Sequence, residues 1–81
     1  MAMQVYGNLV SSDATSARYE FGLDAQDPDR GTLVIPVDDP SAWYVEGRDD
    51  LPRTAALVVG KAVRLRTELG EWPAHAPVFT G

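Results

Sequence analysis

The side chains that most often carry catalysis are few in this chain and lie far apart. His75 is the only histidine and lies in a Pro-Ala-His-Ala-Pro segment, and the chain has no cysteine. Ser11, Ser12, Ser16 and Ser41 occur outside any Gly-x-Ser-x-Gly pattern. A nucleophile needs a base and an orienting group within hydrogen-bond reach. Because the sequence offers no such set, we predict no catalytic residue, no cofactor and no enzymatic activity.

Carboxylates gather at three places, and these are the only candidates for a metal. They are Asp24, Asp27 and Asp29, then Asp38 and Asp39, then Asp49 and Asp50. Such oxygens suit Ca²⁺ or Mg²⁺, but the spacing differs from that of a calcium-binding loop. Solvated turns and a helix cap account for them, so no metal site is predicted.

Basic side chains give the one candidate binding face. Arg53, Lys61, Arg64 and Arg66 fall within one predicted helix. Residues 51–81 carry four basic and two acidic groups, a net charge of +2, whereas residues 1–50 carry three basic and ten acidic groups, or −7. This face is either a site for an anion or a partner, or an ordinary solvated helix surface.

That helix is predicted over residues 51–69. Its apolar residues are spaced by three and four, which places them on one stripe. Asp49 or Asp50 is expected to cap the start, with Pro52 in the first turn and Gly70 ending the helix. Gly60 in the middle costs about 1 kcal/mol relative to alanine. Either a strand or a partner approaches closely there, or the position tolerates glycine at a solvent edge.

Alternating segments before the helix predict strands. They cover residues 3–10, a hairpin over 18–37, and a short strand over 43–46. Pro36 cannot donate a ladder hydrogen bond, so it is expected to mark an edge, a bulge or the end of pairing. We therefore predict an α+β fold of two layers, with a three- to four-stranded antiparallel sheet packed on one face by a single α-helix from the C-terminal half. The residues expected to face inward are Val5, Leu9, Tyr19, Phe21, Leu23, Leu33, Ile35, Val37, Trp43, Val45, Leu51, Ala55, Val58, Ala62, Leu65 and Leu69.

The segment 71–81 is predicted to be an irregular tail. Trp72 and Phe79 are its large apolar side chains. They are candidates for an interaction tail that docks on a partner, although folding back on the core is favoured because exposed tryptophan is uncommon.

Size and charge set the remaining expectations. The 81 residues form one small domain, 1–81, and the chain is acidic with a net charge of −5. No apolar run approaches the ~20 residues of a membrane span, and the lack of cysteine favours a cytoplasmic protein. A thin core, with Tyr6, Val10, Val34 and Tyr44 on the second sheet face, favours a protein-interaction module that acts as a homodimer or as a small acidic subunit of a complex. The alternative is nucleic-acid or phosphate binding through the basic face of helix 51–69.

Overall fold

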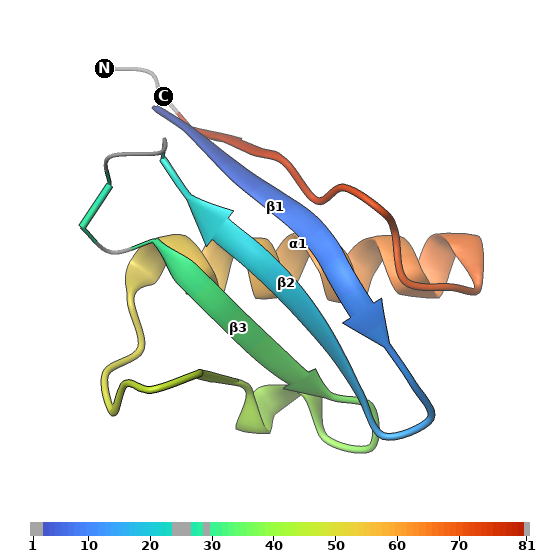
Figure 1. Cartoon of the computed structure of the whole chain (residues 1–81). Coiled ribbons are helices and arrows are strands. Elements are labelled where there is room, and N and C mark those ends of the chain that lie inside the picture. The colour runs from blue at the N-terminus through green and yellow to red at the C-terminus, as the bar shows by residue number, and fades with distance from the viewer. Residues whose placement is uncertain (1–2, 24–26, 29, 81) are drawn as a thin grey trace.

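The computed structural model describes residues 3–23, 27–28 and 30–80, which form an antiparallel sheet and one α-helix in two layers (Figure 1). The elements are β1 (Met3–Ser12), β2 (Ser16–Gly22), β3 (Gly31–Pro36), a 3₁₀ turn η1 (Pro40–Ala42), β4 (Tyr44–Val45), α1 (Arg53–Leu69) and β5 (Val78–Thr80). The predicted α+β class, with a helix over one face of the sheet, is confirmed.

The described strands form one sheet in the order β4-β3-β2-β1-β5, with every neighbouring pair antiparallel. The predicted hairpin over 18–37 is confirmed, since β2 and β3 pair from Ser16↔Pro36 to Phe21↔Gly31. The prediction of three to four strands falls short of the five that the described residues form. The additional strand is β5, which lies within the segment 71–81 that was expected to be irregular.

Helix α1 has 17 residues, and at ~1.5 Å per residue it is roughly 25 Å long. The predicted cap at Asp49 or Asp50 is wrong. The N-cap is Pro52, without a side-chain bond, and Asp50 instead accepts a 2.8 Å hydrogen bond from Arg48 Nε. The predicted end is confirmed: Gly70 has φ 81° and its N–H donates to the Arg66 carbonyl. No helix in the described part of the chain is long and apolar enough to cross a membrane.

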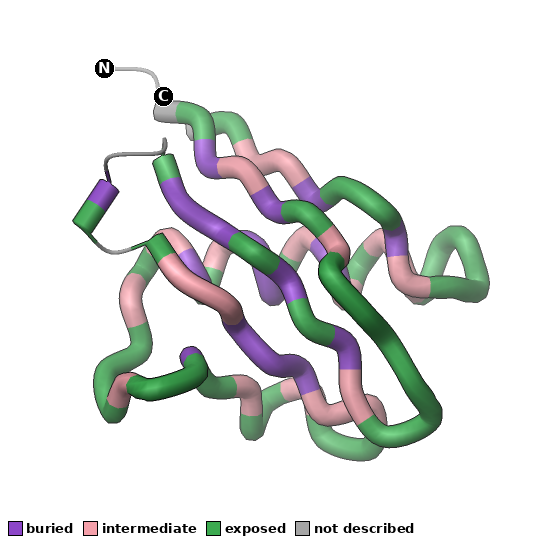
Figure 2. The backbone as a smooth tube through the Cα atoms, in the orientation of Figure 1, coloured by how far each residue is buried: buried purple, intermediate pink, exposed green. Residues whose placement is uncertain are grey.

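The core lies between α1 and the inner face of the sheet, and buried residues alternate with exposed ones along β2 (Figure 2). Its largest fully buried side chains are Tyr19, Phe21, Leu33, Ile35, Val5, Val45 and Val58, all predicted to face inward. Leu23, Leu51 and Leu69 were also predicted inside but are 42, 59 and 61% exposed. Leu51 precedes the helix and Leu69 is its last residue, so both lie at the ends of the apolar stripe, away from the core.

A glycine sets the distance between the helix and β1. A Cβ added at Gly7 would lie 2.6 Å from Cγ1 of Val58 and 3.0 Å from the Ala76 carbonyl oxygen. The first distance is too short for two carbon atoms and the second is tight, so a side chain at this position would force Val58 on α1 to shift and would crowd the segment before β5. Gly7 therefore allows the helix and the tail to pack on the same stretch of β1.

Candidate functional site

The four basic residues predicted as one face are divided by the helix geometry. Arg53, Lys61 and Arg64 are separated by eight and three residues, so they recur on one side of α1. Arg66 follows the fully buried Ala62 by four residues, which places it in line with the buried stripe. Three of the four cations therefore form a common outer surface, and Arg66 belongs to a different one.

Arg66 contacts the tail. The carbon of its guanidinium group lies 4.7 Å from the centre of the Trp72 ring, a distance typical of a cation–π interaction. Trp72 also meets Tyr19 edge to face, with ring centres 6.4 Å apart. The Tyr19 hydroxyl donates a 2.5 Å hydrogen bond to the Pro73 carbonyl, and burial raises the pKa of Tyr19 to about 12. The tail thus folds back here, and Trp72 and Arg66 contribute to stability.

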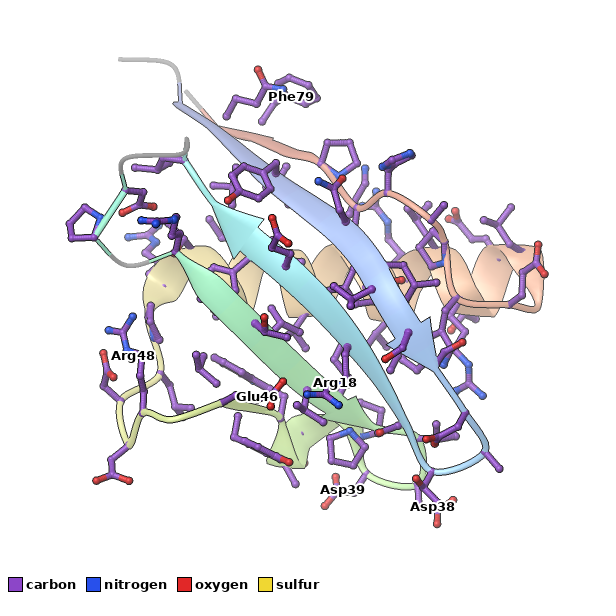
Figure 3. The ribbon with its side chains drawn as sticks, in the orientation of Figure 1. Arg18, Asp38, Asp39, Glu46, Arg48 and Phe79 are labelled. Atoms are coloured by element: carbon purple, nitrogen blue, oxygen red, sulfur yellow. The ribbon has the colours of Figure 1, made fainter. Side chains whose placement is uncertain are left out.

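Phe79 lies elsewhere on the tail and differs from Trp72 in its surroundings. It is the middle residue of β5, at the edge of the sheet beside β1, and it is 71% exposed. Figure 3 shows its ring projecting beyond the sheet. The structure therefore does not bring Trp72 and Phe79 together as one apolar surface, and it leaves Phe79 as the exposed apolar group of the tail.

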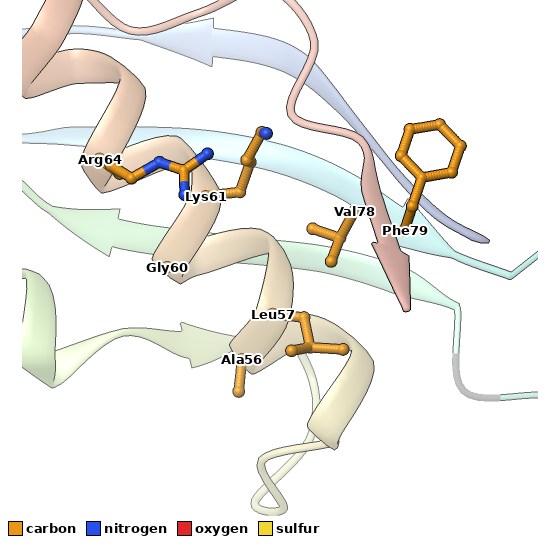
Figure 4. Close-up of a pocket in the computed structure, with 7 residues that line it drawn as sticks. All are labelled: Ala56, Leu57, Gly60, Lys61, Arg64, Val78 and Phe79. Atoms are coloured by element: carbon orange, nitrogen blue, oxygen red, sulfur yellow. The ribbon is translucent and has the colours of Figure 1, made fainter. Parts of the chain in front are cut away.

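A shallow groove runs between α1 and β5 (Figure 4), with a volume of about 470 Å³. It is lined by Ala56, Leu57, Gly60, Lys61, Arg64, Val78 and Phe79. The side chain of Val78 points toward the helix, and that of Phe79 points away from it. The groove thus joins two predicted binding residues of the helix, Lys61 and Arg64, to Phe79 of the predicted interaction tail.

On the helix side of this groove, Gly60 contributes no side chain. A Cβ added at Gly60 would meet no atom within 4 Å, so no described element of the chain approaches this residue. The sequence left two explanations for this glycine, close approach by a strand or a partner and tolerance at a solvent edge. Close approach by another strand of the same chain is excluded for the described residues. A solvent edge or an external partner remains.

The groove has an apolar base and a cationic rim. Leu57 is partly buried and packs against the core, as does Val78. Lys61 and Arg64 make no ion pair with any residue that the structure describes. Two positive charges therefore stand beside apolar surface without a described counter-ion.

The backbone of Phe79 faces away from β1. Asn8 and His75 form an antiparallel bridge in which the hydrogen bonds are made by the residues on either side of the pair. The pair Gln4↔Phe79 continues the same register, four residues along each strand. Because bonded and non-bonded pairs alternate along antiparallel strands, Phe79 also takes a non-bonded position. Its N–H and C=O therefore point outward from the edge of the sheet.

The open face of the sheet, opposite α1, is more polar than the sequence suggested. The guanidinium of Arg18 forms an ion pair with the carboxylate of Glu46 across the outer face (Figure 3). Val34, next to Arg18 in the register, is only 6% exposed, whereas Tyr44 is 50% exposed. The apolar residues predicted for this face thus do not form a continuous exposed patch.

The remaining candidates for chemistry are tied to local structure. His75 Nδ1 lies 2.9 Å from Asn8 Oδ1, which holds the tail to β1. Hydrogen bonds from Thr15 lower the pKa of Asp13 in the turn between β1 and β2, and a hydrogen bond from Arg48 lowers that of Asp50. No three histidine or carboxylate groups come together as a metal site within the described ranges, and the predictions at Asp24 and Asp29 lie outside these ranges.

Comparison with known proteins adds no assignment, because no family model, no curated protein and no solved structure matches this chain.

Sequence reasoning missed the half of the groove that β5 provides. A signal for that strand was present, since Val78, Phe79 and Thr80 are β-branched or aromatic and follow Pro77. The run is only three residues long, shorter than most strands. It is a strand here because β1 extends far enough to pair with it.

Proposed function

We propose that this protein is a non-catalytic interaction module that binds another polypeptide in the groove between α1 and β5. The observation that carries the proposal is the position of the groove, which opens at an unpaired edge of the sheet in the described structure. An edge strand offers backbone donors and acceptors to an incoming chain. Here the same edge also has exposed apolar surface at Phe79.

The groove is a better candidate than the open sheet face. A partner that covered the open face would have to remove the Arg18–Glu46 ion pair from water, and burying such a pair often costs more than it returns. A partner in the groove would cover Leu57, Val78 and Phe79, which gain from burial. The proposal therefore keeps a protein partner, as the sequence suggested, and changes the surface that binds it.

Gly60 supports the same location. Glycine within a helix lowers stability by about 0.5–1 kcal/mol relative to alanine. Beyond the helix's own backbone, no atom of the described chain lies within 4 Å of a Cβ placed at this position. The helix thus leaves a gap at the centre of the groove without any packing benefit inside the molecule, and an incoming side chain can use it.

Nucleic-acid binding through the basic face is the alternative. Arg53, Lys61 and Arg64 share one side of α1, but Arg66 stacks on Trp72. Three phosphate contacts would give a slope of only about −2 to −3 in log Kobs against log salt. The groove's apolar base would have no role in such a complex, so a polypeptide is favoured.

A capture experiment from extract of the native cell tests the proposal. The bait is the intact protein in three forms: wild type, Gly60→Trp, which fills the groove, and Thr67→Trp, which places the same indole ring at an exposed position of α1 outside the groove. All extracts are treated with nuclease, and bound proteins are quantified by mass spectrometry.

The proposal expects a protein that is retained by wild type and Thr67→Trp and lost by Gly60→Trp. Equal retention by all three forms would contradict it. If binding is seen only in untreated extract and ends with nuclease, the nucleic-acid alternative replaces it.

A further inference from the structure

We infer that the groove receives an extended acidic segment of the partner, which joins the sheet as an additional strand beside β5. This inference rests on the function proposed above and adds to it the conformation and the chemistry of the occupant. Three features of the groove support it: the direction of the backbone at Phe79, the spacing of the groove residues along α1, and the charge of Lys61 and Arg64.

The backbone at the edge of the sheet sets the conformation. The N–H and C=O of Phe79 point away from β1 by the alternation of the register. An added strand would satisfy both groups, as in proteins that bind peptides by extending a sheet. The other strand at an edge of this sheet, β4, has two residues and is followed by the turn at Gly47. β5 is thus the edge with a groove beside it.

The pleat of the strand sets which side chains of the occupant reach the groove. Alternate residues of a strand point to the same side and are spaced by about 6.6–6.8 Å. Leu57 and Lys61 are one turn apart on α1, a rise of about 6 Å. One inward side chain of the occupant would therefore lie over Leu57 and Val78, and the inward side chain two positions away would reach Lys61.

The charge of the groove determines which residue type suits the second position, the one that reaches Lys61. Lys61 and Arg64 have no ion-pair partner among the described residues, and they are three residues apart on the same side of the helix. A carboxylate of the occupant placed between them would form ion pairs with both side chains. The rest of the molecule is acidic, with −7 over residues 1–50, so it repels acidic chains elsewhere on the surface. The occupant segment thus carries an apolar residue and an acidic residue, with one residue between them.

Synthetic peptides test this pattern directly with the full chain. The probes are seven-residue peptides, acetylated and amidated, with threonine at every position except the third and fifth. One set carries valine and glutamate at these positions, in both orders, and the control set carries valine and lysine. Binding is measured by fluorescence anisotropy at 50 and 150 mM salt. We expect at least one glutamate peptide to bind tenfold or more tightly than its lysine counterpart.

Charge reversal on the protein locates the acidic preference. In the Lys61→Glu, Arg64→Glu double variant the preference should invert, so that the lysine peptide binds more tightly. Arg53→Glu is the matched single-charge control, because Arg53 is exposed on the same side of α1 but does not line the groove. Arg53→Glu should change the affinity ratio by less than threefold.

Backbone pairing has its own test at Phe79. Phe79→Pro removes the outward N–H and leaves the pairing with β1, since proline is tolerated where a strand's N–H faces out of the sheet. Phe79→Ala is the control for loss of the ring. Strand addition predicts a tenfold or greater loss of peptide affinity in Phe79→Pro relative to Phe79→Ala. A glutamate peptide with N-methylated backbone amides should lose binding to the wild type, whatever the stability of Phe79→Pro.

Failure of the inference and failure of the proposed function have different results. If peptides bind and Gly60→Trp abolishes binding, but glutamate and lysine peptides bind equally, the acidic occupant is refuted and the groove stands. If N-methylated peptides bind as well as unmodified ones, strand addition is refuted. If no peptide binds at all, the inference is refuted, and the three-bait capture experiment independently decides the proposed function.

Discussion

The same substitution, glycine to alanine, is expected to have opposite effects at two positions of this molecule. Gly7 lies in β1 under the helix, and Gly60 lies in the wall of the groove. At Gly7 the new methyl group would lie 2.6 Å from Cγ1 of Val58, whereas at Gly60 it would meet no atom within 4 Å. The pair therefore tests both the close packing of the core and the emptiness of the groove.

The expected magnitudes follow from these distances. Val58 is fully buried and β-branched, so it has one favoured rotamer in a helix and cannot turn aside. The second contact, 3.0 Å away, is the backbone oxygen of Ala76. Gly7→Ala should therefore lower the free energy of unfolding by about 1–3 kcal/mol, as overpacked cores do. Gly60→Ala should raise it by about 0.5–1 kcal/mol, because it removes the helix penalty of glycine.

Thermal and urea unfolding followed by circular dichroism measure both variants. For a domain of this size, 1 kcal/mol shifts Tm by about 4–8 °C. Gly60→Ala should therefore melt roughly 2–8 °C higher than wild type and Gly7→Ala at least about 4 °C lower. A destabilised Gly60→Ala would mean that the space beside Gly60 is filled, which would refute an open groove. A neutral Gly7→Ala would refute the close contact of α1 with β1.

Three further expectations concern the rest of the fold. The pKa of Tyr19 is about 12 in the folded protein and 10.0 ordinarily. The neutral Tyr19 side chain therefore makes its full contribution to the free energy of unfolding below pH 10, and this contribution is lost as the pH rises toward 12. The loss approaches about 2–3 kcal/mol; urea unfolding of Tyr19→Phe should show a flatter dependence, and an unchanged slope would contradict the burial. Because the pKa of Asp13 is lowered, Asp13→Ala should be less stable than wild type at neutral pH and equal to it well below pH 3.8; a gap that persists in acid would count against this cause. Trp72→Ala should lower the free energy of unfolding by about 2 kcal/mol, because it removes the contacts of Trp72 with Tyr19 and Arg66. An unchanged free energy of unfolding in denaturant melts would show that the tail does not support the core.

The elements with strong periodicity were predictable from sequence. The hairpin of β2 and β3 follows from alternation, and Pro36, which lacks an N–H, is the last residue of β3. The end of α1 at Gly70 follows from the left-handed conformation that glycine favours. These features depend on local chemistry, which the sequence displays directly.

The start of α1 and the groove were less accessible. Asp50 is a suitable N-cap by residue type, but its carboxylate accepts a hydrogen bond from the guanidinium of Arg48 instead. β5 is too short to predict from its own residues, and it forms because β1 offers a free edge. The helical spacing separates Arg66 from the other three basic residues, but its contact with Trp72 forms only when the tail folds back. Of these contacts, the pairing of β5 with β1 joins segments distant in sequence, whereas the Arg48–Asp50 contact is local but follows no periodic pattern that the sequence displays.

Amide chemical shifts of the uniformly labelled protein, recorded by NMR during titration with the valine–glutamate peptide, test the central claim most directly. The account predicts that the largest changes fall on both walls of the groove, at Leu57, Gly60 and Lys61 of α1 and at Phe79 of β5, with the exchange of the Phe79 amide slowed by the bound peptide. Changes confined to the open face, at Val34 and Tyr44, or no changes at saturating peptide, would contradict it.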